Sequence, residues 1–345
     1  MLSNQELNST PSIEYIEYAK IPNSPFKPNL LLNLLFGGIL GLIIGTVIAY
    51  RMSIFGTNVI SSEDLEFLGF KIISTIPHIG KNKPLLLKVP EHNKRDEYNE
   101  ASNQEVLDAF HRVSAFLKYG SLEQTIKSVL VTSTGLEEGK SFVASNLAIS
   151  LAQEGHSVLL VDFNLKRPRL HKFFKVNSKP SFAHYLFRKE ELERVIKKTH
   201  VEGLSIITSI EFPQDPSVII TSERMEKFVS LANEKYDYII YDGMALFQCE
   251  EEALLAEILD EIIVVVRANK TSFTDLKKGS AIFSKFNVTP DGYILNDTNN
   301  PDASTTDKNK RDGFSNLPAR RDHYKRFQKS SKHKSADPNL KRRKT

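Results

Sequence analysis

Apolar and polar residues alternate in blocks along the middle of the chain, and the spacing within each block predicts its structure. Short apolar, β-branched runs predict buried strands, whereas apolar residues that recur every three or four positions predict helices. An apolar run at 129–131 is followed by a polar loop, a helical repeat at Ala144, Leu147 and Leu151, and a second apolar run at 158–161. This order predicts a strand, a helix and a second strand.

The same alternation continues toward the C-terminus. Helical spacing is found at 190–198, 222–234, 251–258 and 273–286, and short apolar runs at 204–208, 238–241, 262–266 and 293–295. Strands that alternate with helices are typical of a parallel sheet with helices on both faces. The predicted fold class is therefore α/β, with a mostly parallel, doubly wound sheet.

A different pattern precedes this region. The run at 30–50 has no charged residue, and its one strongly polar interior residue is Asn33. At about 1.5 Å per residue, its length matches the hydrocarbon thickness of a bilayer. A cleaved signal peptide is the alternative, but its apolar run should be shorter, begin earlier and end at a small-residue cleavage site. We therefore predict one transmembrane helix at 29–51.

Composition divides the rest of the chain. The predicted segments are an extracytoplasmic segment at 1–28, a cytoplasmic linker at 52–104, a P-loop domain at 105–297 and a disordered tail at 298–345. Within the linker, the sequence predicts a helix start at 62–65 and a strand at 71–76.

Charge is concentrated in the tail. Residues 301–345 carry a net charge of +9, whereas the rest of the chain carries −5. The tail has almost no aliphatic residues, which predicts disorder. Basic residues near a membrane surface gain about 1 kcal/mol each from anionic lipids. Contact with anionic lipid is thus one expectation for the tail, solvated disorder is the other, and nucleic acid binding is not favoured.

The first predicted loop carries the clearest chemistry, because it ends in Gly139-Lys140-Ser141 directly before a helix. In such a loop the backbone N–H groups and the helix N-terminus converge on one anion. Lys140 would contact the β- and γ-phosphates of a nucleotide, and the Ser141 hydroxyl would bind Mg²⁺. The cofactors implied are ATP and Mg²⁺.

Three further polar residues follow predicted strands: Asp162, Asp242 and Asn296. Ligands of parallel sheets bind at the carboxyl ends of the strands, so these side chains should lie near the loop. Carboxylate oxygens are the ligands that Mg²⁺ prefers.

Taken together, these motifs resemble the bacterial tyrosine kinases (BY-kinases) of capsule and exopolysaccharide export. The kinase domain of that family is fused to, or docks on, a chain-length-determinant membrane protein. The matching segments are the Walker A loop at 131–141, the Walker A′ segment at 158–168, the Walker B strand at 236–242, and the shorter stretches 19–29, 213–216 and 265–267.

The resemblance implies a membrane-anchored, ATP-dependent protein-tyrosine kinase that regulates polysaccharide chain length or export. Its partners would be chain-length-determinant and polysaccharide-export membrane proteins. It would be a single-pass protein of the cytoplasmic membrane, with the C-terminal domain on the cytoplasmic side where ATP is available. The single cysteine, Cys249, excludes an internal disulfide and fits that compartment.

The resemblance also assigns roles to individual residues. Lys140, Asp162 and Asp242 would be catalytic, and Ser141, Asp162 and Asp242 would organise Mg²⁺. The nucleotide would be bound by Gly135, Glu138, Gly139, Lys140, Ser141, Phe142 and Asn296.

The nucleotide motifs depart from the family pattern at two places. Leu136-Glu137-Glu138 stands where the family has Pro-Gly-Glu. Glu137 adds a negative charge beside the triphosphate, and losing the glycine predicts strain in the loop. The second acid of Walker A′ is Asn164, which accepts a hydrogen bond but cannot act as a general base.

Other departures concern assembly and the tail. The two arginines of the family's oligomerisation helix are replaced by His111 and Ser114, after Asp108, which argues against formation of a homo-oligomeric ring. Gly243-Met244-Ala245 replaces Thr-Pro-Pro, and Tyr324 is the only tyrosine in the basic tail.

Three hypotheses follow. Intact Lys140, Ser141, Asp162 and Asp242 favour an active kinase, whereas Glu137, Asn164 and the lost tyrosines favour a catalytically degenerate regulator of the export machinery. A ParA-like partitioning ATPase is the third hypothesis. It is disfavoured by the membrane helix and by Ser133 and Thr134, where that class has a second lysine early in the loop.

Overall fold

The computed structural model describes residues 29–55, 58–79, 97–120, 125–188, 190–210 and 217–298. The chain divides into two compact units that meet between Ile54 and Phe55, and each is described by itself. The predicted N-terminal segment 1–28, the stretch 213–216 and all but the first residue of the predicted tail lie outside the described residues.

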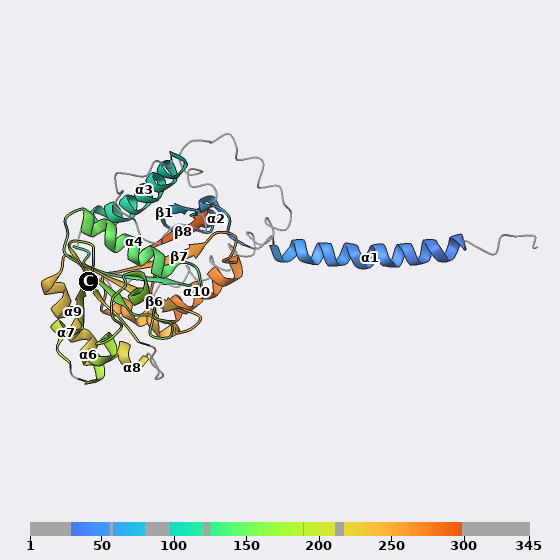
Figure 1. Cartoon of the computed structure of the whole chain (residues 1–345). Helices are drawn as coiled ribbons and strands as arrows, with labels where there is room; N and C mark the ends of the chain where they lie inside the picture. The colour runs from blue at the N-terminus through green and yellow to red at the C-terminus, as the bar shows by residue number, and fades with distance from the viewer. Residues whose placement is uncertain are drawn as a thin grey trace, which may run out of the picture. The chain divides into compact units, whose positions relative to one another are not determined.

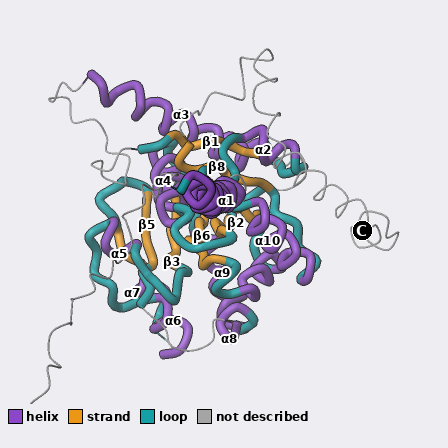
Figure 2. Tube along the Cα trace, turned by 90° about the vertical axis from the view of Figure 1, so that its right-hand side faces the viewer, coloured by secondary structure: helices purple, strands orange, loops and turns teal. Residues whose placement is uncertain are grey.

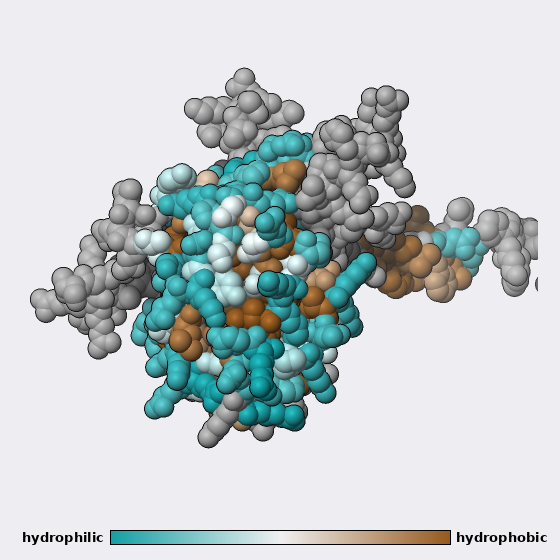
Figure 3. All heavy atoms as spheres, turned by 60° about the vertical axis from the view of Figure 1, so that its left-hand side comes forward, coloured by the Kyte–Doolittle hydropathy of each residue, from teal (hydrophilic) through white to brown (hydrophobic). Residues whose placement is uncertain are grey.

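The first unit contains one long helix, α1 (Leu30–Phe55). Every side chain between residues 31 and 50 is exposed, and most of them are apolar (brown in Figure 3). Among the described residues, Leu31–Tyr50 is the one helical stretch whose length and composition would allow it to cross a membrane.

An eight-stranded sheet organises the second unit (Figure 1). Its strand order is β1-β8-β7-β2-β6-β3-β5-β4, and all neighbours pair in parallel except β4 and β5. The predicted parallel α/β fold is therefore confirmed. The strands are β1 (Ile72–Pro77), β2 (Ser128–Ser133), β3 (Val158–Asp162), β4 (Ile196–Lys198), β5 (Leu204–Ile207), β6 (Tyr238–Ala245), β7 (Glu261–Arg267) and β8 (Gly292–Thr298).

Helices cover both faces of the sheet. Alternate residues of each strand point to opposite faces, so Val129 and Val131 pack in one apolar cluster and Leu130 in another. α3 (Glu97–Tyr119) and α4 (Lys140–Gln153) cover the first face, and α9 (Glu223–Lys235) and α10 (Phe273–Lys285) the second (Figure 2). Burial on both faces explains why the strands are almost continuously apolar.

The remaining helices are short. They are α2 (Ser62–Phe67), α5 (Leu170–Phe173), α6 (Phe182–Arg188), α7 (Leu192–Val195), α8 (Ser217–Ile220) and the 3₁₀ helix η1 (Glu250–Glu257). Helices α5, α6 and α8 were not predicted from the sequence, because none of these three repeats its apolar positions over enough turns to show a period.

The edge strand β1 comes from the region assigned to the linker. It pairs in parallel with β8, and Ile76 is buried in the same apolar cluster as α3. The Ser74 hydroxyl donates a hydrogen bond of 2.9 Å to the Ala109 carbonyl of α3. This strand therefore belongs to the α/β unit, which extends further toward the N-terminus than residue 105.

The predicted helix at 190–198 is wrong beyond Val195. The chain leaves α7 at Ile196 and forms β4, which pairs antiparallel with β5. Without β4, strand β5 would present an open row of backbone groups, and this pairing outweighs the helical spacing of the segment. The predicted helix at 251–258 is instead the tighter 3₁₀ helix η1, which brings Glu252 into the interior.

Phe110 tests the packing of α3 on the sheet, because its side chain is fully buried. We expect Phe110→Ala to lower the free energy of unfolding by about 3–5 kcal/mol, since it removes apolar contacts and leaves a cavity. Urea unfolding of the full chain in a non-ionic detergent would measure this. Tyr119→Ala on the same helix, where the side chain is exposed, should change it by less than about 0.5 kcal/mol.

Candidate functional site

The loop between β2 and α4 lies at the carboxyl end of the sheet's central strands. It is ordered by its own polar groups. The Ser133 hydroxyl donates to the Gly135 carbonyl (2.7 Å), and the Lys140 ammonium donates to the Ser133 hydroxyl (3.0 Å). These bonds fold the loop back on its lysine and give it the form of a P-loop.

Gly139 is required at the end of this loop. Its φ of +101° is unfavourable for residues with a Cβ atom, and an added Cβ would lie 2.0 Å from Asn296 Nδ2. That amide nitrogen donates a hydrogen bond of 3.0 Å to the Glu138 carbonyl. Asn296, on β8, therefore lies directly against the loop, and β8 continues past it to Thr298.

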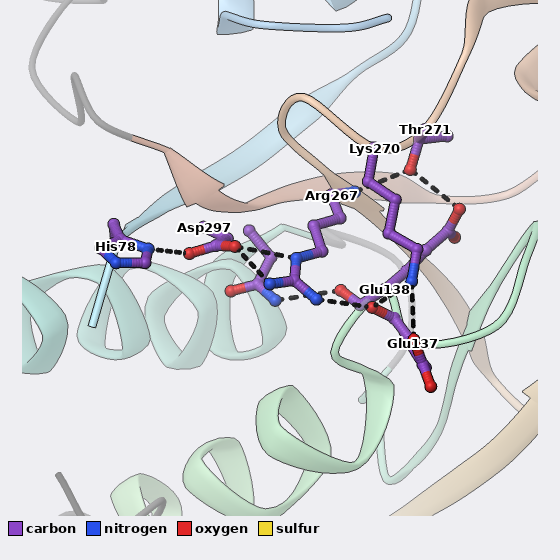
Figure 4. Close-up of polar contacts among 8 residues, drawn as sticks. His78, Glu137, Glu138, Arg267, Lys270, Thr271 and Asp297 are labelled. Atoms are coloured by element: carbon purple, nitrogen blue, oxygen red, sulfur yellow. Dashed lines mark hydrogen bonds and ion pairs between the residues drawn. The ribbon is translucent and has the colours of Figure 1, made fainter. Parts of the chain in front are cut away.

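Glu138 anchors the loop to a second segment. Its buried carboxylate accepts hydrogen bonds from the hydroxyls of Thr134 (3.1 Å) and Thr271 (2.8 Å), which lies between β7 and α10 (Figure 4). Both donors are neutral, so the carboxylate is held in place without an ion pair of its own. Thr271 was not among the predicted site residues, because a single threonine in a loop carries no motif.

Glu137 does not behave as the sequence analysis expected. Its φ of +59° shows that the backbone adopts the left-handed conformation without a glycine. Its carboxylate accepts a hydrogen bond from the Lys270 ammonium (3.1 Å), which lowers the pKa of Glu137, and its carbonyl accepts one from Arg267 (3.0 Å). The added negative charge is therefore paired with Lys270 at the surface, which reduces the predicted repulsion.

The same arginine continues the contact network toward β1. The Arg267 guanidinium donates to the Asp297 carboxylate (2.8 Å from Nε), which also pairs with His78 (Figure 4). Burial raises the pKa of Asp297, but the hydrogen bonds from His78 and Arg267 outweigh it and lower that pKa overall. The segment after β1 is thus joined to the loop through one chain of polar contacts.

The two predicted strand-end acids lie side by side. Asp162 and Asp242 are register partners on β3 and β6, and both are fully buried. Asp162 accepts hydrogen bonds from the backbone N–H groups of Asn164 (3.3 Å) and Leu170 (3.2 Å). Burial raises the pKa of Asp162, and the neighbouring charge of Asp242 raises it further.

Asp242 has no hydrogen bond of ordinary geometry on either carboxylate oxygen. Burial raises its pKa to about 6, while the nearby Ser141 hydroxyl and the Lys140 ammonium act in the opposite direction. A buried carboxylate without partners is costly unless a cation or water completes its coordination. The residues present therefore fit Mg²⁺ bound beside a nucleotide.

Lys140 is almost completely buried at the start of α4. Burial lowers its pKa, and the carboxylates of Asp242, Glu252 and Glu138 oppose that change. An ammonium group placed this way, at the N-terminus of a helix, is suited to bind a phosphate.

The other predicted positions have different surroundings. The Phe142 ring packs edge-on against Phe110 of α3, with ring centroids 6.0 Å apart. The Asn164 side chain accepts a hydrogen bond from the backbone N–H of Arg167 (3.1 Å), so it forms a turn after β3. Glu252, which was missed, lies buried in the same region. Its signal in the sequence, the third of three consecutive glutamates before an apolar run, is not distinctive.

This geometry defines an α/β protein with a P-loop, a class whose fold implies nucleotide binding. A family model described as an AAA domain matches residues 135–288, which include most of the loop and the strands β3 to β7.

Similarity to known proteins narrows the class. Over 83% of its length the chain is 25% identical to the tyrosine-protein kinase ptk of Acinetobacter johnsonii, and over 86% it is 25% identical to the tyrosine-protein kinase etk of Escherichia coli strain K12. It spans 39% and 42% of those two proteins. The solved kinase domain of E. coli ETK superposes with a TM-score of 0.61 at 24% identity, covering 70% of this chain and 95% of that domain.

The chain is homologous to the bacterial tyrosine kinases of capsule and exopolysaccharide systems. The predicted family is thereby confirmed. The roles of individual residues in the site remain predictions.

Gly139 and Gly155 form a matched pair of substitutions. Both have φ near +100°, but an added Cβ at Gly155 meets nothing within 4 Å. Alanine at either position should cost about 1–2 kcal/mol of backbone strain. We expect Gly139→Ala to weaken Mg·ATP binding in addition, by about tenfold or more, because it displaces Asn296. Calorimetry on the full chain would measure this, and equal binding losses in both variants would contradict it.

Asp242 predicts a pH dependence of stability. Because its pKa is about 6 in the folded chain and about 4 when unfolded, the folded state binds more protons between these values, and stability falls as the pH rises through them. Asp242→Asn removes the titrating group, and with it this loss of stability at higher pH. At neutral pH we expect it to raise the free energy of unfolding of the nucleotide-free chain, on the order of 1–3 kcal/mol.

Urea unfolding at several pH values would test this. The gain should vanish at acidic pH, where the wild-type carboxyl is protonated in both states. Asp237→Asn, at an exposed acid just before β6, should give no gain. A stability gain that persists at acidic pH would show that burial of charge is not its cause.

Proposed function

We propose that the protein is a membrane-anchored, Mg·ATP-dependent protein-tyrosine kinase that regulates the chain length or export of a capsular polysaccharide or exopolysaccharide. The observation that carries the proposal is the unpartnered, buried carboxylate of Asp242 beside Lys140 and Ser141 at the P-loop. Sequence similarity to tyrosine kinases over more than four fifths of the chain supports it.

In this proposal the P-loop binds the nucleotide. Backbone N–H groups of the loop and the Lys140 ammonium hold the phosphates. Ser141, Asp162 and Asp242 orient Mg²⁺, which neutralises phosphate charge when bound. Lys140, Asp162 and Asp242 form the catalytic group, Gly135, Glu138, Gly139 and Phe142 shape the nucleotide site, and Asn296 lies on the adenine side.

A catalytically degenerate regulator is the second candidate, and one observation favours it. The Asn164 side chain is engaged in a turn and has no carboxylate, so it offers no general base after β3. In that case the domain binds nucleotide without transferring phosphate, and it acts through its contacts with the export machinery.

We propose that formation of a homo-oligomer depends less on α3 in this protein than in the kinases that the chain resembles. His111 lies within 3.1 Å of the Glu154 carboxylate, and the Ser114 hydroxyl is 3.4 Å from that of Ser150. Both side chains therefore contact α4, or the residue that directly follows it, in the same chain. These two positions therefore offer no arginine to a neighbouring copy, and homo-oligomer formation would need other contacts.

The proposed partner is a chain-length-determinant membrane protein. The solved chimerical protein CapA2B2, whose name combines CapA and CapB, superposes with a TM-score of 0.60 at 24% identity over 68% of this chain. We propose that α1 anchors the protein in the cytoplasmic membrane, with the α/β unit in the cytoplasm and the basic tail against anionic lipid.

Titration calorimetry with Mg·ATP on the full chain in detergent tests the nucleotide site. We expect binding by the wild type and a loss of at least about tenfold in affinity for Lys140→Met, because a buried phosphate contact is removed. The matched control is Lys235→Met, which should bind normally. Lys235 is an exposed lysine of α9 that pairs with Glu193 of α7.

A phosphotyrosine assay then separates the two candidates. Phosphate transfer to tyrosine that requires Lys140 supports the kinase. Binding without transfer supports the regulator, and a wild-type protein that binds no nucleotide would exclude the kinase.

A further inference from the structure

Glu252 is a buried carboxyl group that the proposed function does not use. It lies on η1, its side chain is fully buried, and it is enclosed by β2 and β6. A Cβ atom added to Gly243 would lie 2.6 Å from Glu252 Oε1. The carboxyl group therefore lies directly against the backbone of the residue that follows Asp242.

Two groups contact this carboxyl, and one of them also contacts the Met244 carbonyl. The backbone N–H of Met244 donates to Glu252 Oε1. The Thr132 hydroxyl oxygen lies 2.7 Å from Glu252 Oε2 and 2.8 Å from the Met244 carbonyl oxygen. All these atoms are buried, so no alternative partner from solvent is available to them.

The number of hydrogens decides between two charge states. A hydroxyl has one hydrogen to donate. If Glu252 is ionised, the single hydrogen of Thr132 faces two acceptors, the carboxylate and the Met244 carbonyl, and it can donate fully to only one of them. If Glu252 carries a proton, Oε2–H donates to the Thr132 oxygen, and the Thr132 hydrogen donates to the Met244 carbonyl. Every contact in the ring then has its own hydrogen.

The charges around Glu252 are consistent with this arrangement. Burial raises the pKa of Glu252, and the charge of Asp242 acts in the same direction. The hydrogen bonds from Thr132 and Met244 and the charge of Lys140 oppose this, and the resulting pKa is about 8. The other titratable neighbour is the Cys249 thiol, whose pKa burial raises to about 12, so it adds no opposite charge.

We propose that Glu252 carries a proton and is a positioning residue, which joins Thr132 to both backbone groups of Met244 and so fixes the end of β6 that presents Asp242. The hydrogen-bonded ring stands on the structure alone. The effect of Glu252 on nucleotide binding rests on the proposed function. In that function, a neutral Glu252 adds no negative charge beside the triphosphate.

Glutamine and alanine at position 252 separate this proposal from its alternatives. In Glu252→Gln, the amide oxygen accepts from Met244 and the amide N–H₂ donates to Thr132, so the ring is kept without a charge. We expect this variant to match the wild type in urea unfolding and to bind Mg·ATP within about threefold of it. Glu252→Ala leaves Thr132 and Met244 without their partner, and should lower stability and weaken binding by about tenfold or more.

Infrared spectroscopy of the full chain in detergent near pH 7 provides a direct readout. The difference between wild type and Glu252→Gln should contain the C=O stretching band of a protonated carboxylic acid. Glu257, which is exposed on the same helix, is the control, and Glu257→Gln should leave that band unchanged.

The outcomes are distinct. Absence of the protonated band, or a glutamine variant as impaired as the alanine variant, would overturn the proposal and show that Glu252 acts as an anion. If the alanine variant does not fold, the glutamine variant and the infrared band still test whether Glu252 carries a proton. If the wild type binds no nucleotide, the proposed function fails, but the band and the stability of Glu252→Gln still test the ring.

Discussion

The burial of negative charge at the carboxyl edge of the sheet is the constraint on which the other features of the site depend. Asp162, Asp242 and Glu252 are all fully buried there, and Lys140 is the one ammonium group whose charge acts on two of them, Asp242 and Glu252. Buried carboxylates are stable only when they are hydrogen-bonded, paired or protonated. The three acids differ in this respect: backbone N–H groups satisfy Asp162, a ring of hydrogen bonds satisfies Glu252, and Asp242 is left without a partner.

This difference sets Asp242 apart from the other two acids. A chain that leaves one carboxylate unpartnered in its interior is less stable at neutral pH than it would be with a neutral group there. Such sites are found where a cation completes the coordination of the carboxylate, as Mg²⁺ would do here. The apolar clusters on both faces of the sheet contribute the stability against which this cost is set.

The P-loop is held from outside as well as from within. Glu138 binds Thr271, Glu137 binds Lys270, and Asn296 binds the loop backbone, so the segments after β7 and on β8 fix its shape. The contact chain from Glu137 through Arg267 and Asp297 reaches His78, next to the edge strand β1. Residues on the N-terminal side of the domain are therefore physically connected to the loop.

Local patterns in the sequence determined the class of fold, the long apolar helix and the P-loop, because each depends on residues that are close together along the chain. The apolar runs predicted the central strands and the spacing of Gly139, Lys140 and Ser141 predicted the loop. Other features were decided only by tertiary structure. The segment 196–198 became a strand because β5 had an open edge, Glu137 was neutralised by Lys270, 133 residues away, and Glu252 became part of the site because η1 packs against β2 and β6. Such contacts join residues that are distant in the chain, and no periodicity records them.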